Sequence, residues 1–137
     1  MNIVLAVLIL GGIILFHELG HFIFAKLSGI EVTEFSLGMG PRLLSFVKGE
    51  TRYSLKLLPF GGSCMMLGED EGTMEPGAFA AASVWARISV IAAGPVFNFI
   101  LAFVLSMFII GSIGYDKPVI LQVSDGYPAA EAGLKEG

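Results

Sequence analysis

The sequence predicts an α-helical membrane protein with two transmembrane helices and a β-hairpin between them. Apolar residues make up 55% of the 137 residues and charged residues only 15%, whereas soluble domains usually carry about a quarter charged residues. The deficit is concentrated in two long stretches, Ile3 to Ala25 and Ile88 to Ile110. Between them, the residues from Thr51 to Leu57 alternate between apolar and polar, which is typical of a strand.

The first transmembrane helix is expected within residues 1–28. At about 1.5 Å of rise per residue, the run from Ile3 to Ala25 is long enough to cross a hydrocarbon layer of about 30 Å. A cleaved signal peptide is the alternative, but such peptides carry a basic region before a shorter apolar run. No Lys or Arg precedes Ile3, so a retained span is favoured.

Residues 29–83 form the predicted hairpin and loop region. Lys48-Gly49 separates the alternating run from the apolar segment Leu43 to Val47, which indicates a hairpin turn. The segment from Gly38 to Pro41 indicates an earlier turn. Pro59, with the glycines that follow it, is expected to end the strand region.

The second transmembrane helix is expected within residues 84–111, and it contains no ionisable residue from Ile88 to Ile110. Six basic residues lie between the two spans and only two follow the second span. Because Lys and Arg favour the cytoplasmic side, the central loop is predicted to be cytoplasmic and both termini extracytoplasmic. Residues 112–137 are polar and too short to bury a core of their own.

Composition also excludes some partners and sites. The net charge is −4, and no basic run interleaved with aromatic residues indicates nucleic-acid binding. Cys64 is the single cysteine, so an internal disulfide is excluded and no second cysteine offers a metal-ligand spacing.

His17-Glu18-Leu19-Gly20-His21 is an H-E-x-x-H pattern inside the first span. On a helix His17 and His21 lie one turn apart on the same face, where both imidazoles can bind one Zn²⁺ ion. Glu18 stands beside the metal and can act as a general base. Ionisable side chains are costly inside a membrane, so a metal site is favoured over core histidines that are merely hydrogen-bonded.

Two histidines do not complete a catalytic zinc site, which normally has three protein ligands. The sequence has no further His, and Asp116 and Asp125 lie beyond the end of the second span. The sequence therefore contains no convincing third ligand.

Asn98 is the strongly polar side chain within the second span, three residues after Gly94-Pro95. Such a side chain should face protein rather than lipid. One interpretation is a contact that joins two helices. The other is a contact to the substrate or to the water at the metal, which would make Asn98 a substrate-binding residue.

Four motifs in order resemble the site-2 protease family of intramembrane zinc metalloproteases, and in particular its bacterial members that cleave membrane-bound anti-sigma factors. They are the H-E-x-x-H core; the stretch Phe35 to Pro41; the run Leu58 to Gly62 followed by Met66 to Asp70; and Ala93-Gly94-Pro95 with Asn98-Phe99. They cover almost the whole chain.

The resemblance implies that His17 and His21 are zinc ligands and Glu18 the general base of a protease in the bacterial inner membrane. The hairpin would be membrane-associated and would lend a strand edge to the substrate, an established way to hold an extended peptide. The substrate would be a transmembrane segment of a regulatory protein, such as an anti-sigma factor, or a signal-peptide remnant.

The tail within residues 112–137 resembles the start of a PDZ domain that is cut off at Gly137. The family takes its third ligand from an Asp in a later span, and Ser124-Asp125-Gly126 in the tail does not fit that role. Ser63-Cys64 also departs from the residues common in the family after the Gly-Gly pair. The rival hypothesis is therefore a truncated, non-catalytic paralogue that binds membrane partners.

Overall fold

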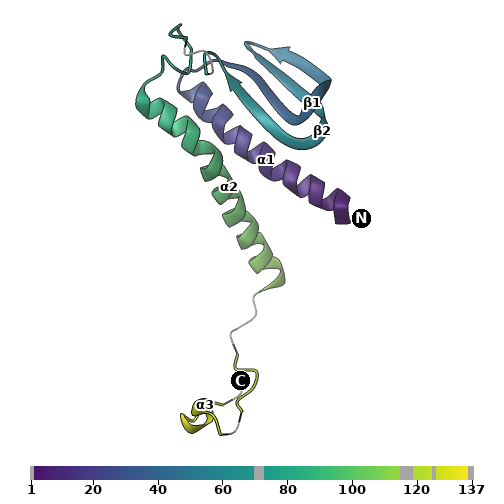
Figure 1. Ribbon diagram of the computed structural model, residues 1–137, viewed down its shortest axis with the longest axis vertical. Helices are drawn as coiled ribbons and strands as arrows, with labels where there is room; N and C mark the ends of the chain where they lie inside the picture. Colours follow the sequence, from purple (N-terminus) through teal and green to yellow (C-terminus); the bar gives the residue numbers. More distant parts are fainter. Residues whose placement is uncertain (1, 70–72, 115–118, 125, 136–137) are drawn as a thin grey trace. The chain divides into compact units, whose positions relative to one another are not determined.

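The computed structural model describes residues 2–69, 73–114, 119–124 and 126–135. The chain divides into two compact units, Met1–Val104 and Leu105–Gly137. Its elements in order are α1 (Asn2–Leu27), β1 (Val32–Lys48), β2 (Thr51–Met66), α2 (Val84–Ile113) and α3 (Pro128–Glu131) (Figure 1).

Both predicted spans lie inside long helices. α1 and α2 are each long and apolar enough to cross a membrane. Their apolar side chains are largely exposed; Leu8 in α1 and Phe99 in α2 are 66% and 76% exposed. Pro95 lies inside α2 without ending the helix.

The predicted hairpin is confirmed. Lys48 pairs with Thr51 and Val47 with Arg52 across an antiparallel turn. The strands are longer than expected and shift register repeatedly, so that the first half of β1 finds partners on two sides. On one side, Glu34 to Leu37 pair with residues 62–65 in the antiparallel sense. On the other side they pair with Arg52 to Leu55, and here the residue numbers of both segments increase in the same direction.

Two sequence expectations for this sheet need correction. The segment from Gly38 to Pro41 does not separate two strands, because β1 bends there and continues to Lys48. Gly38 allows the bend, since its φ is +89° and a Cβ on it would lie 2.5 Å from the carbonyl oxygen of Leu58. Pro59 and the glycines after it do not end β2 either, because the strand continues to Met66.

The small core lies where the sheet meets the end of α1 and the beginning of α2. Ala25, Ile30, Val32, Cys64 and Val90 are buried there. Aromatic side chains extend the contact, since the ring centroid of Phe22 in α1 lies 5.1 Å from that of Phe35 in β1. The sheet is thereby held against the half of α1 that carries the H-E-x-x-H pattern.

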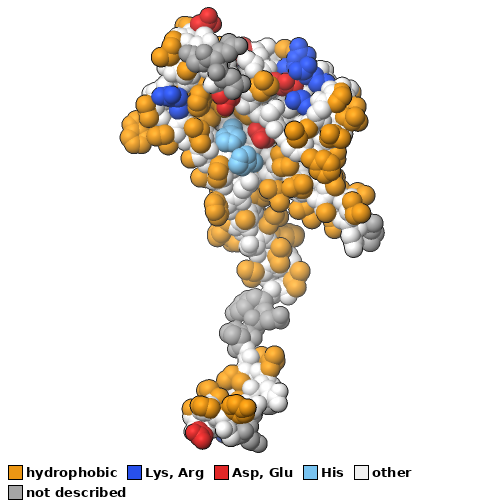
Figure 2. All heavy atoms as spheres, viewed as in Figure 1, with side chains coloured by type: hydrophobic (Ala, Val, Ile, Leu, Met, Phe, Trp, Pro, Cys, Tyr) orange, Lys and Arg blue, Asp and Glu red, His pale blue; other side chains and the backbone are white. Residues whose placement is uncertain are grey.

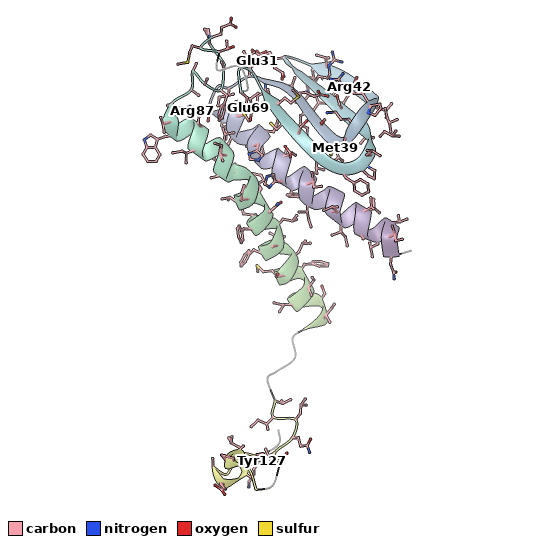
Figure 3. The ribbon with its side chains drawn as sticks, viewed as in Figure 1. Glu31, Met39, Arg42, Glu69, Arg87 and Tyr127 are labelled. Carbon is pink, nitrogen blue, oxygen red and sulfur yellow. The ribbon has the colours of Figure 1, made fainter. Side chains whose placement is uncertain are left out.

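A charged cluster holds the folded sheet together. Glu34 is buried, and its carboxylate accepts hydrogen bonds of 3.0 Å each from Nε and Nη2 of Arg42. Lys56 Nζ lies 3.8 Å from the same carboxylate. The hydrogen bonds from Arg42, followed by one from Ser54 and then by the charges of Lys56 and Arg42, lower the pKa of Glu34 to about 2 although burial opposes the shift. Figure 3 shows Arg42 on the sheet, away from α1.

The second unit contains the end of α2, an irregular segment at residues 119–124 and the short helix α3. No described residue of this unit forms a strand, so the PDZ-like start stays a prediction. Asp116, Lys117 and Asp125 lie outside the described residues.

Candidate metal centre

The H-E-x-x-H pattern lies in the second half of α1, beside α2. The ring centroids of His17 and His21 are 4.8 Å apart, with the ring planes at 78°. Helical spacing alone explains this arrangement, because residues four apart share a face. Figure 2 shows the two pale-blue histidine side chains together on one face of the molecule, with acidic side chains in red beside them.

The Nε2 atoms of both histidines point to the same place on α2. A Cβ built on Gly94 would lie 2.7 Å from His17 Nε2, and His21 Nε2 would lie nearer still. Glycine therefore lets both imidazole rings approach the backbone of α2 with their Nε2 atoms near the same position. Neutral imidazole nitrogen is a common zinc ligand, so this pair of donor atoms fits Zn²⁺.

Each histidine has a partner on α2 for its other ring nitrogen. His21 Nδ1 lies 2.8 Å from the backbone carbonyl oxygen of Val90. His17 Nδ1 lies 3.2 Å from Nδ2 of Asn98. Metal-binding histidines typically have such a second contact, which fixes the orientation of the ring.

The two helices approach closely at the same level. A Cβ on Gly20 would lie 2.5 Å from the carbonyl oxygen of Ala93 and 3.1 Å from the amide nitrogen of Gly94. A larger residue at position 20 would separate the helices and move the histidines away from Gly94. Small residues at such crossings are common in membrane helices.

Glu18 faces the sheet rather than α2. A Cβ on Gly62 of β2 would lie 2.8 Å from Glu18 Cγ, so the strand passes directly beside this side chain. Glu18 and His21 line a cavity of about 260 Å³ that also includes Cys64 and Glu69. The carboxylate therefore has room for a water molecule or a peptide group next to His21.

The described residues supply no third ligand: none of their His, Cys, Asp or Glu side chains forms a group of three that could hold a metal ion. Cys64 is nearby, but burial, followed by the charges of Glu18 and Glu69, raises the pKa of its thiol to about 12.

Residues 5–133 match peptidase family M50. The chain belongs to peptidase family M50. This membership confirms the resemblance to the site-2 proteases and assigns the H-E-x-x-H pattern to a metalloprotease family. The first of the two relatives described next is named as a zinc metalloprotease.

A protein of Clostridium acetobutylicum named as a zinc metalloprotease is 45% identical to this chain over 136 residues. The aligned residues cover 99% of this chain and 40% of that protein. The regulator of sigma-W protease RasP of Bacillus subtilis is 30% identical over 220 aligned positions, which cover 99% of this chain and 52% of RasP. The chain thus spans about half or less of these relatives' length.

The sequence predicts a site with His17, Glu18, His21 and Asn98. The structure brings His17, His21 and Asn98 together between α1 and α2, and it places Glu18 beside β2 in a cavity shared with His21. Sequence reasoning missed the roles of Gly20 and Gly94. Gly94-Pro95 looks like an interruption of an apolar helix, and only the position of α1 shows that the absent side chain matters. Gly62 was likewise taken as a strand terminator, although it lies against Glu18.

Proposed function

We propose that this chain forms the zinc-binding part of an intramembrane endopeptidase. The observation that carries the proposal is the convergence of His17 Nε2 and His21 Nε2 beside Gly94, on a helix long and apolar enough to span a membrane. Membership in family M50 and relatives named as zinc metalloproteases support it.

The proposed chemistry is hydrolysis of a peptide bond. His17 and His21 hold the zinc ion, which when bound supplies Lewis-acid activation. Glu18 accepts the proton of the attacking water and passes it to the leaving amine. Its position between the histidines and β2 supports this role, because the carboxylate shares a cavity with His21.

The third ligand is proposed to be a carboxylate outside the described residues, as the resemblance implies for an Asp of a later span. The relatives are longer than the aligned region and have room for such a span. If no such ligand joins the pair, the rival function, a non-catalytic protein that binds membrane partners, applies.

The proposed substrate is a transmembrane segment of a regulatory protein, such as an anti-sigma factor, or a signal-peptide remnant. One relative is named as a regulator of sigma-W protease, which supports the regulatory class. A helical segment must unwind before its carbonyl can reach the metal, since helical backbone is fully hydrogen-bonded. The exposed strand edges of the sheet, beside α1, suit an extended peptide.

The proposed location is the bacterial inner membrane, with the sheet on the cytoplasmic side and both termini outside. The excess of basic residues between the spans supports this orientation. The tail would then begin an extracytoplasmic PDZ-like domain.

The test compares wild type with Glu18→Gln in the protein as its cell makes it, purified in detergent with a model transmembrane substrate. We expect the wild type to cleave, and Glu18→Gln to keep zinc while losing cleavage at least about 100-fold. Glu69→Gln is the matched control, because Glu69 lines the same cavity but is exposed; it should retain activity. Cleavage by Glu18→Gln at the wild-type rate would contradict the mechanism. A wild type that binds no zinc and cuts nothing would favour the non-catalytic function.

A further inference from the structure

The two histidines of the site differ in what their Nδ1 atoms meet. His21 Nδ1 lies 2.8 Å from the carbonyl oxygen of Val90, and a carbonyl oxygen can only accept a hydrogen bond. His21 therefore carries its proton on Nδ1. Its Nε2 lone pair, which points to Gly94, is left free for a metal ion.

His17 meets a side chain that can present either a donor or an acceptor. Its Nδ1 lies 3.2 Å from Nδ2 of Asn98. If this amide nitrogen donates to Nδ1, the neutral ring must carry its own proton on Nε2. A protonated Nε2 beside Gly94 cannot bind a metal ion.

The same asparagine has an unsatisfied oxygen. Asn98 Oδ1 is buried, and it has no hydrogen-bond partner among the described residues. A buried acceptor left without a partner destabilises the folded chain. Both the donor at His17 and the unpaired oxygen belong to one carboxamide.

Rotation of the carboxamide by 180° removes both conflicts. It exchanges Oδ1 and Nδ2 with almost no change in shape, since the two atoms are nearly the same size. Oδ1 then accepts the proton of His17 Nδ1, in the way that the Val90 carbonyl accepts that of His21. Both Nε2 lone pairs are then directed to the space at Gly94.

We propose that Asn98 is a positioning residue whose carboxamide oxygen holds the proton of His17 on Nδ1 and so prepares Nε2 to bind zinc. This role rests on the proposed function of the site, and it differs both from substrate binding and from a simple contact between helices. It explains why a largely apolar helix carries an amide at this position. A membrane span tolerates such a group when it is buried and hydrogen-bonded.

The test measures zinc affinity, by competition with a chelator, in the full protein purified in detergent. Asn98→Leu keeps the shape but removes both polar atoms, and we expect zinc binding to weaken about 10- to 100-fold. Asn98→Asp keeps an acceptor and removes the donor, so it should bind zinc within a few-fold of wild type. Ser106→Ala, an exposed polar position on the same helix, is the control and should change nothing.

Two results would overturn the proposal. Asn98→Leu with wild-type zinc affinity would reduce Asn98 to a helix contact or a substrate contact. Asn98→Asp as weak as Asn98→Leu would show that the donor Nδ2, not the acceptor, is required. Helix content by circular dichroism shows which variants fold, and Asn98→Ala replaces Asn98→Leu if the latter does not. A wild type without zinc would instead contradict the proposed function, and this inference with it.

Discussion

The carbonyl oxygen of Ala93 lies 2.5 Å from where a Cβ would stand on Gly20, so α1 and α2 touch backbone to backbone. One residue further along α2, Gly94 meets the Nε2 atoms of both histidines. The helix crossing and the candidate metal centre are therefore one feature. A change that separates the helices should disturb the metal centre, whereas a change at the centre can leave the crossing intact.

Gly20→Ala tests the crossing. Its Cβ would meet backbone atoms of α2, which cannot rotate away, so the helices must separate. We expect a loss of about 1–3 kcal/mol in the free energy of unfolding, together with weaker zinc binding. Thermal unfolding followed by circular dichroism measures the first effect. Gly12→Ala is the control, because nothing lies within 4 Å of its Cβ position; it should be neutral or stabilising by up to about 1 kcal/mol.

Gly94→Ala tests the metal centre itself. The new methyl group would occupy the space between His17 Nε2 and His21 Nε2, so the imidazoles must turn away. We expect zinc content, measured by mass spectrometry of the metal, to fall close to zero while both helices remain folded. Gly111→Ala on the same helix meets nothing within 4 Å and should keep its zinc. Stoichiometric zinc in Gly94→Ala would show that the metal does not bind at this position.

The sequence predicts the parts of this fold that depend on local pattern. Long runs with almost no charged residues identify both helices, and Lys48-Gly49 identifies the hairpin turn because the strands on either side pair directly across it. It does not predict how far the strands extend. Proline and glycine usually end strands, but residues 62–65 pair with the first half of β1, and this distant partner outweighs the local preference.

The same limit applies to the site. The spacing of His17 and His21 is a local property of one helix, so the pattern reveals it. The roles of Gly20, Gly62 and Gly94 depend on which atoms of another element come close, and a glycine carries no side chain that would indicate its neighbour. Asn98 could be recognised as unusual from its apolar surroundings, but its partner could not.

Gly62→Ala tests the position of Glu18. Its Cβ would lie 2.8 Å from Glu18 Cγ and 3.0 Å from Cγ2 of Ile14, so the Glu18 side chain must move. We expect the cleavage rate to fall at least about 10-fold, because a small misplacement of a catalytic group is costly, while zinc affinity stays near that of wild type.

Ser63→Ala is the control for this strand. It removes the 2.8 Å hydrogen bond between Ser63 Oγ and Ser36 Oγ and so weakens the strand without reaching Glu18. Equal losses of activity in Gly62→Ala and Ser63→Ala would assign the effect to the strand rather than to Glu18.

The Glu34 carboxylate should make the stability of the sheet depend on pH. Its pKa is lowered from 4.5 to about 2 in the folded chain, chiefly by the hydrogen bonds from Arg42. The unfolded state therefore binds the proton more tightly than the folded state does. The stabilisation is complete above about pH 4.5 and is lost as the pH falls from there towards 2.

Glu34→Gln removes this charge. We expect wild type to be more stable than Glu34→Gln by about 1–3 kcal/mol at neutral pH. This difference in stability should shrink as the pH falls below 4.5 towards 2. Thermal unfolding in detergent measures it. Glu50→Gln is the control. It removes an exposed pair at 3.4 Å from Lys26, and such pairs contribute about 0–1 kcal/mol. The difference in stability between wild type and Glu34→Gln could instead be the same at pH 7 and pH 2. The charged hydrogen bonds to Arg42 would then not be its source, and the amide would disturb the sheet by its packing alone.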